Sequence, residues 1–368
     1  MKEYNYRKIF VLSDLHFGVR NNALAWIDMM NAFYRWFIDD VEKQGFDAER
    51  DALFILGDVF HSRESINLMT LNNVCKVFST IREKFTNVHI LTGNHDTYYI
   101  DNNSITTVKL LSDLVKGIEC WYEPEQIAIN GNKVLMLPWI TSFNAIHDFI
   151  DKDDSDYLFC HMDINGMKYS SGINIDKCVD TNRIKKYKKV FSGHIHTRQD
   201  KGNVLYVGAP YQLDSSDFNN DRGYYIIDTK DFSYTFVQNN ISPKYISVEF
   251  DYIMNLPANK AKEILDNNYV DMFCSRKVYE NADLILLKQK LNELGIDFKS
   301  MSFTMINSGS NIEEDMATAS FDFNIHDACI KMLKDAKKSD SEIEDTMEYF
   351  NMIYTLTKTD AYNGIQGS

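Results

Sequence analysis

The sequence predicts a layered α/β protein followed by a smaller α+β domain. Two observations lead to this fold class. Short β-rich runs alternate with amphipathic helical runs in the first part of the chain, and strands then follow in closer succession up to about residue 240. A second set of strands and helices begins near residue 246, and a length of 368 residues allows about two domains. The hydrophobic fraction of 44% can fill both cores.

The first domain is predicted to span residues 1–240. Strands are expected where Val, Ile, Leu and Phe cluster, at residues 8–12, 53–56, 88–91, 134–137, 157–160, 190–192, 204–207 and 224–227. Helices are expected where apolar residues recur near a spacing of 3.6, at residues 23–41, 67–85 and 107–115. This order favours a layered α/β domain with either one mixed sheet or two packed sheets.

The second domain is predicted to span residues 241–307, with strands at 246–250, 270–274 and 302–305 and helices at 258–266 and 282–294. An acidic linker is expected at 308–320, and residues 321–360 are expected to form two helices, 325–336 and 341–356. The second of these helices carries an apolar stripe: Ile343, Met347, Phe350 and Tyr354. The stripe either packs on the chain's own domain or lies in the groove of a partner.

Composition excludes several classes of protein. No apolar run approaches the ~18 residues that a membrane span needs, and the polar start MKEYNYRK is unlike a signal peptide. The expectation is therefore a soluble cytoplasmic protein without a membrane partner. Six cysteines without CxxC spacing indicate neither a thiolate zinc site nor a disulfide framework.

The negative net charge of the chain does not indicate a nucleic-acid-binding protein. Lys and Arg number 39 against 53 Asp and Glu, which gives −14, whereas nucleic-acid binding is driven by basic surface. Half of this charge lies in residues 309–368, which hold 12 acidic and 5 basic side chains. One basic cluster either lines a DNA path or forms a solvated face: Arg183, Lys185, Lys186, Lys188, Lys189, Arg198 and Lys201.

Five short segments place metal-capable side chains directly after predicted strands. They are Asp14-Leu15-His16, Gly57-Asp58-Val59-Phe60-His61, Gly93-Asn94-His95-Asp96, Cys160-His161 and Gly193-His194-Ile195-His196. Six of the nine histidines lie in these segments. Because catalytic groups in α/β folds gather at the carboxyl ends of strands, the segments are expected to meet at one rim.

The donor types suit a two-metal centre. Carboxylates, one amide oxygen and several imidazoles form a mixed N/O set that favours Mn²⁺, Fe²⁺ or Zn²⁺ over a closed structural zinc site. One carboxylate that bridges two ions would complete a hydrolytic centre. Asp58 is the natural bridge, because its neighbour Gly57 lets the backbone turn tightly.

In order, these segments read DxH, GDxxx, GNHD, a lone His and GHxH, which resembles the calcineurin-like metallophosphoesterase superfamily. The resemblance implies a four-layer α/β/β/α sandwich and two divalent metal ions, with Mn²⁺ favoured. It implies one ligand set of Asp14, His16, Asp58 and His196, and another of Asp58, Asn94, His161 and His194. It also implies that His95 donates a proton or hydrogen bond to the phosphate and leaving oxygen, and Asp96 is expected to orient the His95 imidazole.

Within that superfamily, the segment GDVFHSR carries His61 where protein phosphatases have Asp. Together with GHIHTRQ, it looks like the SbcD-type DNA nucleases of the meiotic-recombination-eleven family, and the run after it looks most like the T-even-type phage versions. In that family the His61 position contributes to catalysis. The resemblance implies a capping domain, a helix pair that grips an SMC-like ATPase of the SbcC or Rad-fifty type, and a homodimer within a heterotetramer.

The function implied is DNA exonuclease and endonuclease action on double-stranded ends and single strands, in recombination, repair and end processing, in the host cytoplasm if the chain is phage-encoded. Two alternatives stay open from the residues alone. One is another calcineurin-like phosphatase or a nucleotide phosphodiesterase. The other is a non-catalytic scaffold that only organises the ATPase, which the complete donor set argues against.

Overall fold

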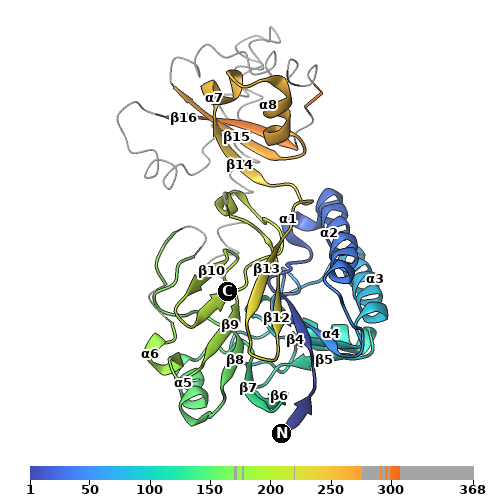
Figure 1. Ribbon diagram of the computed structural model, residues 1–368, viewed down its shortest axis with the longest axis vertical. Coiled ribbons are helices and arrows are strands. Elements are labelled where there is room, and N and C mark those ends of the chain that lie inside the picture. The colour runs from blue at the N-terminus through green and yellow to red at the C-terminus, as the bar shows by residue number, and fades with distance from the viewer. Residues whose placement is uncertain are drawn as a thin grey trace, which may run out of the picture. The chain divides into compact units, whose positions relative to one another are not determined.

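The computed structural model describes residues 1–306, except 170–171, 176–177, 219, 276–290, 292–294 and 297–298 (Figure 1). The chain divides into two compact units, Met1–Asn307 and Ser308–Ser368. The predicted linker, both C-terminal helices with their apolar stripe, and the helix expected at 282–294 lie outside the described residues. The domain boundaries drawn from the sequence stay predictions.

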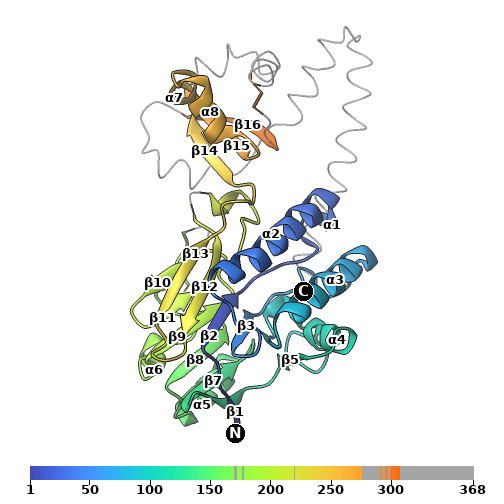
Figure 2. The ribbon, with the colours of Figure 1, turned by 45° about the vertical axis from the view of Figure 1, so that its right-hand side comes forward.

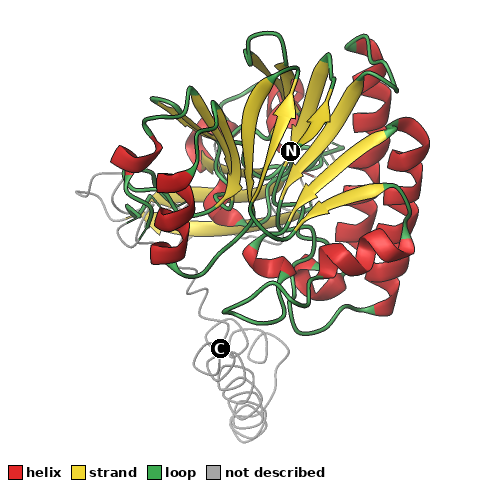
Figure 3. Cartoon of the chain, turned by 90° about the horizontal axis from the view of Figure 1, so that it is seen from below, coloured by secondary structure: helices red, strands yellow, loops and turns green. Residues whose placement is uncertain are grey.

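Two mixed sheets form the body of the protein (Figures 1 and 3). The seven-stranded sheet has the order β1 (Lys2–Tyr4), β6 (Glu125–Ile129), β7 (Asn132–Leu137), β8 (Tyr157–His161), β9 (Lys189–Gly193), β11 (Val204–Tyr206) and β10 (Gln199–Lys201). The six-stranded sheet has the order β13 (Tyr234–Gln238), β12 (Gly223–Asp228), β2 (Lys8–Leu12), β3 (Asp51–Leu56), β4 (Asn87–Leu91) and β5 (Ile118–Trp121). Strands β2, β3, β4 and β5 are parallel to one another, as are β7, β8 and β9.

The helices lie on the two outer faces of the paired sheets (Figures 2 and 3). They are α1 (Val19–Asn22), α2 (Leu24–Lys43), α3 (Leu68–Lys84), α4 (Thr107–Leu114), α5 (Phe143–Lys152) and α6 (Thr181–Ile184). The first of these is a short left-handed turn, since Arg20 and Asn21 have φ of 57° and 54°. Three of the others begin at a capping side chain: Asn67, Thr106 and Ser142 each accept a backbone N–H at the start of α3, α4 and α5.

Alternation along the strands sorts the apolar side chains into three separate layers. Phe10 and Leu53 face a core shared with α2, α3 and α4, whereas their neighbours Ile9 and Phe54 face the space between the two sheets. A third cluster joins the outer face of the other sheet to α5 and α6. Three cores between four layers make an α/β/β/α sandwich, which confirms the predicted fold class.

A separate three-stranded sheet follows in the chain. Strands β14 (Tyr245–Glu249), β15 (Tyr269–Ser275) and β16 (Ser300–Ile306) are parallel, in that order, and α7 (Phe250–Met254) and α8 (Ala258–Leu265) connect the first two. Side chains including Ile253, Leu265, Val270 and Met272 form its own small core. The three strands and α8 match the predicted strands and the first predicted helix of the α+β region to within two residues, whereas α7 was not predicted.

Every strand predicted for residues 1–240 overlaps an observed strand. The sequence missed α1, β1, β5, β6, β10, β13 and α6, which are short or mix polar with apolar residues, so their periodicity is weak. It also missed α5, although the apolar residues of that helix, among them Ile146 and Ile150, recur at helical spacing. Among the described helices, none is long and apolar enough to cross a bilayer.

Candidate metal centre

Parallel strands of both sheets deliver the polar segments to one rim. Asp14 and His16 follow the end of β2, Asp58 follows β3, and η1 (Asn94–Asp96) follows β4. In the facing sheet, His161 is the last residue of β8, and the segment from His194 to His196 follows β9. The predicted convergence is therefore observed, because parallel strands of one sheet end at the same edge.

The backbone at this rim is held in a conformation that side chains rarely adopt. Asp14, His16, Asp58 and His194 have φ of 54°, 48°, 53° and 89°, in the left-handed region. Such residues cost about 1–3 kcal/mol each and persist where surrounding structure holds them. Here the amides of Asp14 and His16 donate to the carbonyls of Gly57 and Asp58 at 3.0 Å each, which ties the two segments together.

Two glycines allow the segments to approach closely. Gly57 has φ of 92°, and a Cβ on it would lie 2.3 Å from Nδ1 of His161. A Cβ on Gly93 would lie 2.2 Å from Oδ1 of Asp58. Both distances are far shorter than any real contact, so a side chain at either position would push donor groups out of the rim.

The first donor group consists of Asp14, His16 and His196, whose donor atoms lie within 4.8 Å of one another. Nε2 of His16 is 2.9 Å from Nε2 of His196. Burial and the neighbouring His196 lower the pKa of His16 well below its usual value. The ring is thus held neutral, which is the form that binds a metal ion.

The second group consists of Asp58, His161 and His194, again within 4.8 Å, with Asn94 beside it. Oδ1 of Asn94 is 3.0 Å from Nε2 of His161 and 2.9 Å from Nδ1 of His194. Nδ1 of His161 donates to the carbonyl of Leu56 at 2.6 Å, since a carbonyl can only accept.

These bonds fix which atoms carry lone pairs. In the neutral His161 ring the proton is on Nδ1, so Nε2 faces Asn94 Oδ1 and Asp58 Oδ2 as an acceptor, at 3.0 and 3.4 Å. Acceptors that meet at such distances need a cation or a proton between them. The mixed N/O donors fit a divalent ion of the Mn²⁺, Fe²⁺ or Zn²⁺ type.

Asp58 lies between the two groups. Its Oδ2 is 3.7 Å from Nε2 of His16 in one group and 3.4 Å from Nε2 of His161 in the other. Although burial alone would raise it, the neighbouring His161 and His16 lower the pKa of Asp58 well below its usual value. In return, Asp58 outweighs the effect of burial and raises the pKa of His161 to about 9. The carboxylate is therefore ionised at the position that a bridging ligand would need.

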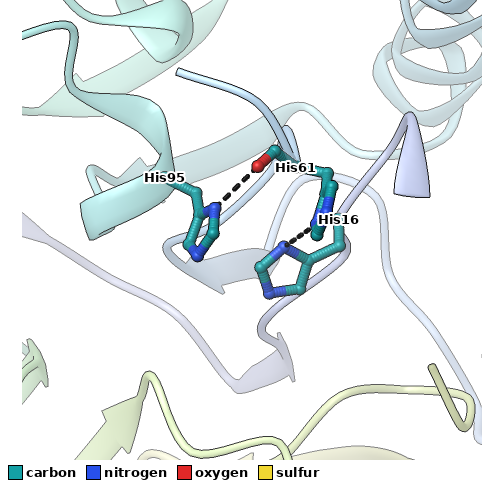
Figure 4. A group of neighbouring side chains, drawn as sticks. All are labelled: His16, His61 and His95. Atoms are coloured by element: carbon teal, nitrogen blue, oxygen red, sulfur yellow. Dashed lines mark hydrogen bonds between the residues drawn. The ribbon is translucent and has the colours of Figure 1, made fainter. Parts of the chain in front are cut away.

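His95 and His61 form a third cluster with His16 (Figure 4). Nδ1 of His95 donates to the carbonyl of His61 at 2.6 Å, and Nδ1 of His61 lies 3.4 Å from Nδ1 of His16. The backbone N–H of His95 donates to Oδ1 of Asp58 at 2.8 Å. Because Nδ1–H of His95 is engaged by the carbonyl of His61, the other ring nitrogen, Nε2, is the one left to interact with a substrate.

Comparison with known proteins decides the family. The family model described as calcineurin-like phosphoesterase matches residues 7–198, just over half of the chain. The chain belongs to the calcineurin-like phosphoesterase family. Exonuclease subunit 1 of enterobacteria phage T4 is 25% identical over 238 residues, which cover 63% of this chain and 68% of that protein. A solved structure of an archaeal phosphodiesterase aligns over 63% of this chain and 99% of that one, with 12% identity and a TM-score of 0.32.

In this phosphoesterase, Asp96 does not hold the ring of His95, contrary to the prediction. Its buried carboxylate accepts hydrogen bonds from three backbone N–H groups and one hydroxyl, those of Val59, Phe60, Gly93 and Thr107. Asp96 therefore fixes the loop that carries Asp58, while the carbonyl of His61 orients His95. Burial and the charge of Asp58 raise the pKa of Asp96 to about 6.

The sequence missed one residue of the phosphoesterase site, Asp163. Its Oδ1 is 3.1 Å from Nε2 of His194, and it accepts the hydroxyl of Tyr169 at 3.0 Å. A carboxylate behind a ligating imidazole fixes the tautomer and turns the other nitrogen, here Nδ1, toward the metal side. The signal available was an Asp two residues after His161, in a segment otherwise read only for its histidine.

Most side chains of the basic cluster within residues 183–201 form ion pairs with carboxylates or hydrogen bonds with backbone carbonyls. Arg183 pairs with Asp151, and Lys188 and Lys189 lie 2.7 and 2.9 Å from Asp156 and Asp200. Other members bond elsewhere too: Lys186 to the carbonyls of Ile150 and Asp153, and Lys201 to the carbonyl of Gly166. Such pairing favours the solvated face over a DNA path.

Proposed function

We propose that this phosphoesterase is a metal-dependent DNA nuclease, with exonuclease and endonuclease action in recombination, repair and end processing. The observation that carries the proposal is the convergence of two histidine–carboxylate groups on a shared Asp58. The similarity to a phage exonuclease subunit supports DNA as the substrate. The substrates would be double-stranded ends and single strands.

Two divalent ions, with Mn²⁺ favoured, would be held by the donors at the rim. One set comprises Asp14, His16, Asp58 and His196, and the other Asp58, Asn94, His161 and His194. When bound, such ions polarise the phosphate and supply a nucleophile at neutral pH. His161 and His194 present their lone pairs because Leu56 and Asp163 accept the protons on their other nitrogens.

His95 would act on the substrate. With Nδ1–H bound to the carbonyl of His61, its Nε2 can donate a proton to the leaving oxygen or a hydrogen bond to the phosphate. His61 supports this role twice, because its carbonyl orients His95 and its ring lies against His16. Asp96 contributes by fixing the loop of Asp58.

We further propose the partners that the family resemblance implies. The α+β region with β14, β15 and β16 would cap the DNA site, and the helices predicted within 321–360 would bind an SMC-like ATPase of the SbcC or Rad-fifty type. The T4 relative is itself named as a subunit. A homodimer would complete the assembly, and Leu110 and Leu114, one turn apart on α4 and 43% and 52% exposed, offer apolar surface for a second copy.

The test is a nuclease assay on linear duplex and single-stranded DNA with Mn²⁺ or Mg²⁺, with and without the cognate ATPase. The proposal expects cleavage that depends on metal, with the ATPase increasing cleavage of duplex DNA. A clear preference for a phosphomonoester or a small nucleotide over DNA would favour the phosphatase or nucleotide phosphodiesterase instead. ATPase binding without any hydrolysis would indicate a non-catalytic scaffold.

A further inference from the structure

A cavity of about 590 Å³ lies beside the candidate metal centre. Trp139 connects the two: it is one of the residues that line the cavity, and its ring lies 5.0 Å from the ring of His194, tilted by 33°. The ring of His161 is 6.2 Å away, edge-on. A molecule in this cavity would therefore contact a residue that also packs against two of the metal donors. The volume is typical of a small-molecule site.

A closed loop forms one wall of the cavity. Thr97 and Thr106 pair across its base, and the amide of Tyr98 donates to the carbonyl of Ile105 at 3.0 Å. At its tip, the side-chain amide of Asn103 donates to the backbone carbonyls of Tyr122 and Trp139, at 3.0 and 2.9 Å.

These bonds hold the loop against the opposite wall. The loop begins directly after the segment that carries His95, so it connects the cavity to the reacting groups along the chain as well as in space. The cavity is therefore preformed rather than made by a mobile flap.

The lining chemistry suits a flat, uncharged heterocycle. Two of the lining residues, Tyr122 and Trp139, are aromatic, and base–aromatic stacking accepts every base because each has a π face. Two carboxylates, Asp101 and Glu123, line the cavity against one ammonium, Lys109. This balance disfavours a second phosphate, but it offers hydrogen-bond partners to the amino and carbonyl groups of a base.

Lys109 has a specific position. Its Nζ lies 5.0 Å from the centre of the Tyr122 ring, where a cation is attracted to the aromatic face. From there it can donate to a ring carbonyl of a base that stacks nearby.

We propose that this cavity is a nucleobase subsite, which receives an unpaired base of the nucleotide next to the scissile phosphate. The inference rests on the proposed nuclease function, since the phosphate of that nucleotide would sit at the metal centre. It narrows the substrate to a strand whose terminal or flanking base is free of its pairing partner. Duplex DNA would then have to be opened, or frayed at an end, before cleavage.

The test is equilibrium binding of two product-like ligands to the Mn²⁺-loaded full chain by calorimetry. One is deoxyadenosine 5′-monophosphate, and the other is deoxyribose 5-phosphate, which lacks the base. The expected result is that the base strengthens binding roughly 5- to 150-fold, the range found for one stacked base. Tyr122→Ala should lose most of this preference, and Tyr122→Leu serves as a second variant that keeps bulk without an aromatic face.

Phe149→Ala is the matched control, because Phe149 is an exposed aromatic on α5 that does not line the cavity. Equal affinity of the wild type for both ligands, or an unchanged preference in folded Tyr122 variants, would overturn the subsite. A base preference without DNA cleavage would uphold the subsite and contradict the nuclease. DNA cleavage without a base preference would uphold the nuclease and contradict the subsite. The two proposals can therefore fail separately.

Discussion

Two buried histidines on neighbouring parts of the sandwich have opposite acid–base behaviour. His161 ends β8 and is 0% exposed, and its pKa is raised to about 9. His89 lies in the middle of β4 and is 2% exposed, and its pKa is lowered to about 4. Burial opposes the charged form of both rings, so burial alone cannot explain the difference.

The difference lies in the partner carboxylate, which is buried beside one histidine and partly exposed to water beside the other. His161 stands at the rim, where the ionised Asp58 lies 3.4 Å away and outweighs burial. His89 points into the space between the sheets, against Phe54 and Trp121, and its Nε2 pairs with the hydroxyl of Tyr6 at 2.7 Å. A carboxylate also lies 3.4 Å from its Nδ1, but that group, Glu119, is 33% exposed to water, and its attraction does not outweigh burial. In this sandwich, the histidine in the middle of β4 is part of the core, and the histidine at the carboxyl end of β8 is a candidate metal donor.

The largest effect on hydrolysis is expected from the carboxylate that both donor groups share. Asp58→Ala should lower hydrolysis of bis(4-nitrophenyl) phosphate to the uncatalysed background, because each ion loses a ligand and their separation is no longer fixed. Metal content, measured by mass spectrometry, should fall together with the rate. A folded Asp58→Ala protein that keeps wild-type turnover would rule out the shared centre.

His95 tests whether a histidine can belong to the rim without binding metal. His95→Gln should lower kcat by roughly 10² to 10⁴, the range for a lost general acid. Both ions should stay bound, since Asn94 supplies the neighbouring donor. Substantial loss of metal in calorimetry would instead make His95 a ligand.

A smaller effect on metal affinity or activity is expected from Asp163, which contacts a proposed ligand and not the ions themselves. Asp163→Asn should weaken metal affinity or activity roughly 10- to 100-fold, because His194 loses the charged partner that fixes its tautomer. Asp200→Asn is a suitable control, since Asp200, in β10, pairs with Lys189 and not with a metal donor. Equal metal titration curves for the wild type and Asp163→Asn would show that this contact has no role in the site.

His89 should not affect hydrolysis at all, but it should affect stability in acid. Because its folded pKa of about 4 lies below the unfolded 6.5, the unfolded chain binds the extra proton between these values. The free energy of unfolding should thus fall by roughly 2–4 kcal/mol as pH drops from 6.5 to 4. His89→Gln should flatten this dependence in urea titrations, and an unchanged slope would contradict the structural role.

The sequence could place the rim because its donors follow strands with strong apolar runs, as Asp58 follows 53–56. It could not show the left-handed backbone at Asp14 and His16, since glycine is the residue type that indicates this conformation in a sequence. It misassigned Asp96 because hydrogen bonds to backbone N–H groups have no residue pattern. It missed β6, whose first residues, Glu125 and Gln126, are polar and weaken the apolar run.

The central claim is that the rim holds two ions that act on DNA. The most direct measurement is titration of metal-free protein with Mn²⁺, following ions bound per chain and cleavage of a single-stranded oligonucleotide in the same samples. The account predicts two ions per chain, with cleavage that rises as the sites fill and disappears with a chelator. Cleavage that persists in metal-free protein, or two bound ions with no cleavage of any DNA, would contradict it.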